Sequence, residues 1–152
     1  MIPRPTTDEL IVDCCRELSE HILPALTDET LQVRVVMAET VLRNAAVRAA
    51  HEIAWLREET AKLCGFAATV AERHPSPPIA AALAAVESGP RDSLHLADVV
   101  TVYELAGRAF EAALGVADQA GSTDLVARAR RVLHDRVETE KQVMAAYAVV
   151  GR

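Results

Sequence analysis

Four acidic or histidine side chains lie on helical segments at spacings that could support metal chemistry. His134 and Glu138 form an H-x-x-x-E pair, a spacing that di-iron helical bundles use. Such bundles also need Glu-x-x-His pairs that converge from several helices, and no E-x-x-H occurs in this chain. We therefore expect an ordinary solvent-facing i,i+4 pair and no bound metal. His95 and Asp98 are expected at the edge or back of their own helix.

Glu140 is a different kind of candidate because it falls in the middle of a predicted apolar stripe. The stripe consists of Val126, Ala129, Leu133, Val137, Met144 and Tyr147. A buried carboxylate is costly unless it is paired, hydrogen-bonded or protonated. Tyr103 and Glu140 lie at nearly equal distances in sequence from the turn at Gly121, so in an antiparallel hairpin they face each other. We expect either a core hydrogen bond between them or a perturbed acid that lines a ligand pocket, with Glu39 as its next member.

The remaining ionisable groups favour structural interpretations. His21 lies one turn after Glu17, at the C-terminal end of a helix whose dipole favours a cation. A basic cluster without aromatic partners predicts a solvated face; it consists of Arg128, Arg130, Arg131 and Arg136. The motifs G-x-x-x-x-G-K-[ST], G-x-S-x-G and H-E-x-x-H are absent. We predict no catalytic residue and no cofactor, which makes an enzyme the less favoured class.

These groups are carried by helices, and the longest predicted helix runs over residues 27–64. Apolar residues recur along it at three- and four-residue steps: Leu31, Val35, Ala38, Leu42, Ala45, Ala49, Ile53 and Leu56. Further predicted helices span residues 6–23, 79–87, 93–119 and 124–149, with two more turns over 66–73 after Gly65. No strand pattern is present. The expected fold is all-α, an antiparallel bundle of four main helices and one short helix, in one domain over residues 1–152.

A second apolar group lies on the rear face of the long helix. It consists of Val33, Met37, Val47 and Trp55, with His51 beside them. A tryptophan in such a setting is typical of an interface anchor. Packing against the short helix, the seam of a homodimer and a ligand cleft are all compatible with this pattern.

The first third of the chain resembles a known protein family. Arg4-Pro5-Thr6-x-x-Glu9-Leu10, then Leu23-Pro24-Ala25-Leu26 and Arg34-Val35 are similar to a small bacterial all-helical family of unknown function. Members of that family often accompany aminoglycoside-phosphotransferase-like proteins. The resemblance implies an accessory domain with such a partner and transfers no catalytic residue.

The overall composition narrows the class of protein. The net charge of −6 disfavours nucleic acid, and no stretch has the length and low charge of a membrane span. Cys14, Cys15 and Cys64 have no C-x-x-C spacing, so reduced thiols and a cytoplasmic location are expected. The sequence favours a non-catalytic accessory or interaction protein, expected to be a homodimer. The alternative is a ligand-binding or enzymatic bundle that uses Glu140, Tyr103 and Glu39.

Overall fold

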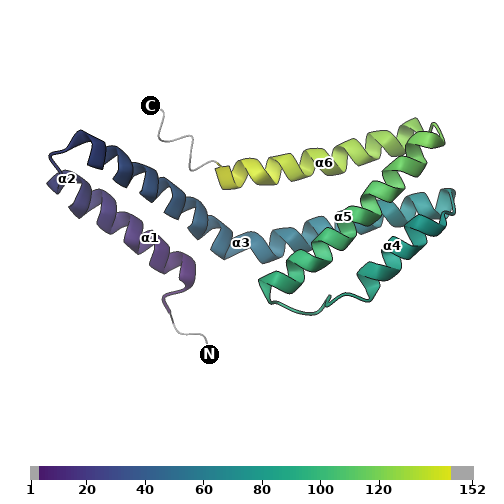
Figure 1. Cartoon of the computed structure of the whole chain (residues 1–152), viewed down its shortest axis with the longest axis horizontal. Helices are drawn as coiled ribbons and strands as arrows, with labels where there is room; N and C mark the ends of the chain where they lie inside the picture. The colour runs from purple at the N-terminus through teal and green to yellow at the C-terminus, as the bar shows by residue number, and fades with distance from the viewer. Residues whose placement is uncertain (1–3, 145–152) are drawn as a thin grey trace. The chain divides into compact units, whose positions relative to one another are not determined.

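The structure, a computed structural model, describes residues 4–144, with side chains through Lys141. Its elements are α1 (Thr7–Glu17), the π-helical turn η1 (Leu18–Ile22), α2 (Leu23–Ala25), α3 (Glu29–Arg73), α4 (Pro77–Glu87), α5 (Leu96–Gln119) and α6 (Thr123–Met144). Figure 1 shows their order along the chain. No strand occurs in this part of the chain, which confirms the all-helical prediction. None of the described helices is long and apolar enough to cross a bilayer.

The start of α1 follows the predicted capping box. The backbone N–H of Thr6 donates to Oε2 of Glu9 at 2.7 Å, and the Thr6 side chain accepts from the backbone of Glu9.

The first helical segment does not end at Pro24 as expected. It passes through η1, where Leu23 N–H donates to the Leu18 carbonyl. This wider turn accommodates a proline in the following short helix, since Pro24 has no N–H to pair.

The long helix α3 is a single element of 45 residues. Asp28 begins it, accepting from the backbone N–H of Thr30 at 2.8 Å and of Leu31 at 3.3 Å. Gly65 neither interrupts nor ends the helix, and the two additional turns over residues 66–73 are continuous with the rest.

The predicted short helix begins two residues earlier than expected, at Pro77, where prolines suit the first turn. The last predicted helix extends beyond Met144, and that part lies outside the described residues.

Contacts divide the chain into two compact units. One consists of Met1–Glu52 and Thr139–Arg152, and the other of Ile53–Glu138. The helices α3 and α6 each contribute to both units. The expectation of one domain over residues 1–152 stays a prediction.

The unit of residues 53–138 contains a hydrophobic core built from α3, α4, α5 and α6. Its fully enclosed side chains are small apart from Phe66, Ile79 and Leu125. Phe66 and Phe110 provide its aromatic contact, with ring centroids 5.0 Å apart and a tilt of 48°. Alanines of α5 fill much of the remaining space: Ala106, Ala109, Ala113 and Ala117. The core therefore contains few aromatic residues, and its small side chains allow the helices to pack closely.

The buried face of α6 differs from the predicted stripe. Leu125 and Ala129 are buried and Val132 is partly buried, whereas Leu133 is 41% exposed and Val137 46% exposed. Two stripes share Ala129 on this helix, and the neighbours of α6 select the one that starts at Leu125. The stripe predicted through Leu133 is therefore wrong for the described part of α6.

The other unit has a much smaller described core. Cys15 and Ala46 are its buried apolar residues, and Thr40 and Asn44 are its buried polar residues. The thiol of Cys15 donates to the Glu39 carbonyl at 3.8 Å, which joins α1 to α3. Burial raises the pKa of this thiol. The predicted apolar stripe of α3 is not the enclosed face here, since Leu31 is 43% exposed and Ala38 and Ala49 are exposed.

Two glycines give opposite predictions for stability. A Cβ at Gly65 would meet no atom within 4 Å, so Gly65→Ala should raise the free energy of unfolding by about 0.5–1 kcal/mol. Gly121 has a φ of +63° in the turn before α6, so Gly121→Ala should cost about 1–2 kcal/mol. Urea unfolding of both variants measures these changes. A destabilising Gly65→Ala would show that α3 is not a regular helix at this position.

Candidate functional site

A polar junction joins three helices in the unit of residues 53–138. The Tyr103 hydroxyl of α5 donates to Oε1 of Glu59 on α3 at 3.0 Å. The same oxygen lies 3.6 Å from Nε of Arg136 on α6. The side chain of Glu59 is only 18% exposed. A carboxylate in this setting is stabilised by a hydroxyl donor and a cation together.

Further polar contacts hold α3 to α6 on one side of this junction. Lys62 Nζ lies 3.1 Å from Oδ2 of Asp135. Near the other end of α6, Arg73 pairs with Asp124, and hydrogen bonding to Arg73 lowers the pKa of the Asp124 carboxyl. Exposed pairs of this kind each contribute little to stability. These pairs join neighbouring helices, since each charged group pairs with a side chain of the other helix.

The three predicted pocket residues are distributed between the two units. Tyr103 pairs with a carboxylate as expected, but the carboxylate described for it is that of Glu59. Glu140 is exposed, whereas its predicted place was in the core. Glu39 is 17% exposed and forms an ion pair with Arg43 at 2.5 Å. A contact between Tyr103 and Glu140 stays a prediction, since the two residues belong to different units.

The histidines considered for metal binding are exposed, as is Glu138, whereas Asp98 is partly buried. His134 and Glu138 form the predicted i,i+4 pair at 3.9 Å, with His134 70% exposed. His95 is the exposed residue before α5, and Asp98 accepts from Ser93 Oγ at 2.6 Å. Among the described residues, no three His, Cys, Asp or Glu side chains converge as a metal site requires.

The sequence periodicity predicts an apolar stripe of Leu10, Cys14, Leu18 and His21 on the first helix, and this prediction is wrong for His21, which is 65% exposed and lies 3.9 Å from Glu17. Leu10 and Cys14 are also exposed. The basic cluster lies on an exposed face, as expected, since Arg128, Arg130, Arg131 and Arg136 are all exposed. Arg136 also lies 3.6 Å from Glu59 through its guanidinium. A long arginine side chain can lie along a helix surface and still reach a partner at its tip.

The residues predicted as an interface also divide between the two units. Val33 is 58% exposed and Met37 63% exposed, and Val41, which the prediction omitted, is 56% exposed. His51 is exposed, whereas Val47 and Trp55 are partly buried. Trp55 belongs to the unit of residues 53–138, and the others belong to the unit of residues 1–52 and 139–152, the N-terminal unit. The exposed apolar surface of α3 is therefore concentrated before residue 42.

Sequence reasoning missed Glu59, the central residue of the polar junction. Its position carried a usable signal, because Glu59, Leu63, Phe66 and Val70 follow one another at helical three- and four-residue steps. The last three are buried core residues. A carboxylate that continues such a stripe predicts a partner on a facing helix, which here is Tyr103.

Comparisons with family models, with curated proteins and with solved structures found no match for this chain. The similarity of the first third to an accessory family therefore stays a prediction.

The junction can be tested by a double-mutant cycle. Tyr103→Phe and Glu59→Ala should couple by about 1 kcal/mol, because either change removes the same charge-assisted hydrogen bond. Glu58 is an exposed neighbour on the same helix, so the matched cycle with Glu58→Ala should give coupling within about 0.3 kcal/mol of zero. Urea unfolding supplies all the free energies.

Equal coupling in the Glu59 and Glu58 cycles would contradict the described contact. A third cycle with Glu140→Ala measures whether Tyr103 also couples to Glu140, as the sequence predicts.

Proposed function

We propose that this chain is a non-catalytic protein-interaction module that pairs with a second copy of itself through the first half of α3. The observation that carries this proposal is a row of exposed apolar side chains on a unit whose described residues form only a small core. The row consists of Val33, Met37 and Val41. Successive members are four residues apart, so they lie on adjoining turns of one helix face.

The described residues of the N-terminal unit form only a small core. Its described buried side chains are those of Cys15, Thr40, Asn44 and Ala46. Neither Nδ2 nor Oδ1 of Asn44 has a hydrogen-bond partner in the described part of the chain. An enclosed amide without partners costs about 1–3 kcal/mol. A helical hairpin with so small a core needs further apolar burial to be stable.

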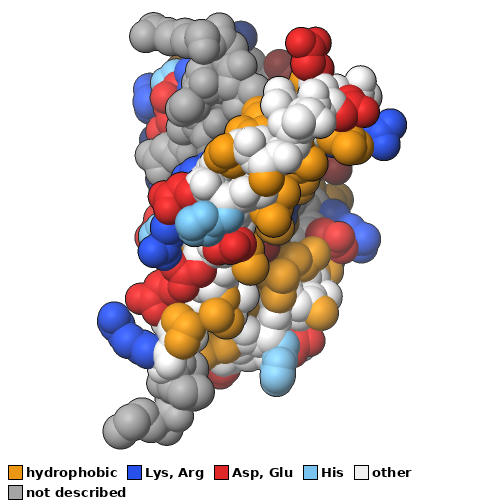
Figure 2. Space-filling view, turned by 90° about the vertical axis from the view of Figure 1, so that its left-hand side faces the viewer, with side chains coloured by type: hydrophobic (Ala, Val, Ile, Leu, Met, Phe, Trp, Pro, Cys, Tyr) orange, Lys and Arg blue, Asp and Glu red, His pale blue; other side chains and the backbone are white. Residues whose placement is uncertain are grey.

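Large apolar side chains are instead at its surface. Besides the row on α3, they include Leu10, Val12, Ile22 and Leu31, each between 42% and 52% exposed. Figure 2, which looks toward this unit, has hydrophobic side chains gathered in the middle of the face with charged side chains around them. Contiguous apolar surface of this kind is typical of protein interfaces, whereas single exposed apolar residues are common everywhere.

The order of residues within the row favours a second copy as the partner. Val33 and Val41 lie four residues before and after Met37. In a twofold antiparallel pairing of two α3 helices, Met37 therefore meets its own copy and Val33 meets Val41. Glu39, the acid within this stretch, is already paired with Arg43, so the pairing brings no unpaired carboxylate into the seam.

The proposal also includes two further parts of the sequence prediction, the antiparallel bundle and the cytoplasmic location. The short connections at residues 74–76 and 120–122 favour antiparallel neighbouring helices, as in the expected bundle of four main helices and one short one. All three cysteines are free thiols, which supports a reducing compartment such as the cytoplasm.

The interface is tested by placing a charge in the row. Met37→Glu should weaken self-association at least about tenfold, because a carboxylate would be desolvated without a partner. The matched control is Leu133→Glu, which changes an exposed leucine of the other unit and should leave association unchanged. Sedimentation velocity at micromolar concentration, with circular dichroism to confirm folding, measures both variants.

A monomeric wild-type protein at that concentration would overturn the dimer. An aminoglycoside-phosphotransferase-like protein is the other partner that the sequence resemblance implies. If it forms a heteromer with a monomeric chain, and Met37→Glu abolishes that heteromer, the row is an interface with a different occupant and the second copy is excluded.

A further inference from the structure

A cavity of about 250 Å³ lies within the unit of residues 53–138. Its walls come from α3, α4, α5 and the connection between α4 and α5. The apolar part of its lining includes Val86, Val99 and Val102, which are each at least nine-tenths buried. The polar part includes Arg57, Thr60 and Arg91. Apolar walls with a few convergent polar groups are typical of small-molecule sites.

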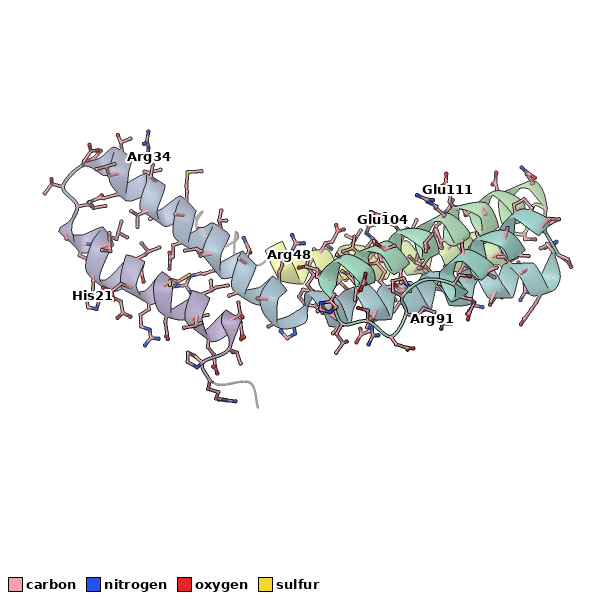
Figure 3. All side chains as sticks on the ribbon, turned by 60° about the horizontal axis from the view of Figure 1, so that its bottom comes forward. His21, Arg34, Arg48, Arg91, Glu104 and Glu111 are labelled. Carbon is pink, nitrogen blue, oxygen red and sulfur yellow. The ribbon has the colours of Figure 1, made fainter. Side chains whose placement is uncertain are left out.

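The edge of this cavity is held in place by specific contacts. Arg57 Nη2 on α3 donates to the backbone carbonyl of Arg91 at 2.7 Å, which brings two arginines to one edge. Figure 3 shows Arg91 on the connection that leads from α4 to α5. The connection approaches α5 closely at Gly89, where a Cβ would lie 3.3 Å from Cγ2 of Val102. These contacts hold the backbone of the connection beside the cavity.

The charge of the lining favours an anion. Two arginines and one glutamate line the cavity, so it carries one net positive charge, whereas the whole chain carries −6. Glu87 pairs with Arg91, and Arg57 has no ion pair in the described part of the chain. Arginine binds carboxylates through two parallel hydrogen bonds. A single net positive charge suits a carboxylate better than a phosphate dianion.

The size of the cavity restricts the rest of the ligand. Ligand pockets usually have volumes of roughly 300–1,000 Å³, so this one suits a fragment-sized molecule rather than a nucleotide. Cys64 also lines it, and burial raises the pKa of its thiol, which keeps the thiol neutral near pH 7. The thiol therefore adds no negative charge against an anion.

We propose that this cavity binds a small monocarboxylate, with its short apolar body against Val86, Val99 and Val102 and its carboxylate at Arg57 and Arg91. The site is independent of the proposed dimer, because the two use different units of the chain. It also differs from the ligand pocket expected around Glu140, Tyr103 and Glu39, none of which lines it.

Cys64 provides a direct measurement of occupancy. Cys14 is exposed and Cys15 is buried, so in a Cys14→Ser chain the alkylation of Cys64 by N-ethylmaleimide can be followed by mass spectrometry. Hexanoate and benzoate at millimolar concentration should slow this alkylation. Hexanamide has nearly the same shape without the charge, and inorganic phosphate has charge without an apolar body. Both should protect at least about tenfold more weakly.

The arginines are tested in the same assay. Arg57→Gln and Arg91→Gln should each weaken hexanoate protection about tenfold, since a charge-assisted hydrogen bond is lost. Arg108→Gln, which changes an exposed arginine of α5 outside the cavity, should have no effect. Circular dichroism verifies that the variants fold. Equal protection by hexanamide or phosphate, equal loss in Arg108→Gln, or no protection by either carboxylate would each overturn the proposal.

Discussion

The continuity of α3 is the constraint on which the rest of the structure depends. One helix of 45 residues supplies a wall to both compact units. Its second half places Leu63, Phe66 and Val70 in the larger core, and its first half packs against α1 through the Cys15 contact. Gly65 does not interrupt it, because helix propensity at one position is a small term beside the packing of the turns around it. The helices α1, α4 and α5 each lie within one unit, whereas α6, like α3, contributes residues to both.

Small side chains determine how the larger core is filled. Ala67 of α3 and four alanines of α5 are fully buried, so helices in this unit can approach closely without large aromatic residues. Each alanine buries little apolar area, so the core is stabilised by many small contacts rather than by a few large side chains. At the edges of this core, polar side chains complete the docking. Glu59 is the clearest case, since it accepts from Tyr103 and lies beside Arg136.

The two units differ in what they leave open. The described residues of the N-terminal unit include few buried side chains and an exposed apolar row on α3, a surface that suits another protein. The larger unit has a well-filled core and a small cavity with a net positive lining, a site that suits a small anion. Protein contact and ligand binding would thus use different chemistry in different parts of one chain. Neither requires a catalytic group, and the acids Glu59 and Glu39 that might have served as one are held in polar pairs.

The sequence by itself determined the helices and most of their ends. The Thr6–Glu9 capping box, the Asp28 cap, the prolines at residues 77 and 78 and the turn at Gly121 are local signals, and local hydrogen bonding decides them. The apolar face of α5 was also readable, because Val99, Ala106, Phe110 and Ala117 leave little choice of side.

Only the tertiary structure decided which of two similar faces is buried where a helix offers both. On α6 the stripes through Leu125 and through Leu133 share Ala129, and only the positions of the neighbouring helices select the first. The partner of Tyr103 depends in the same way on the helix that faces it, because a pairing counted from the Gly121 turn considers α6 and leaves out α3. Periodicity shows that a helix has a buried face, but the identity of a long-range partner is set by packing between segments far apart in the chain.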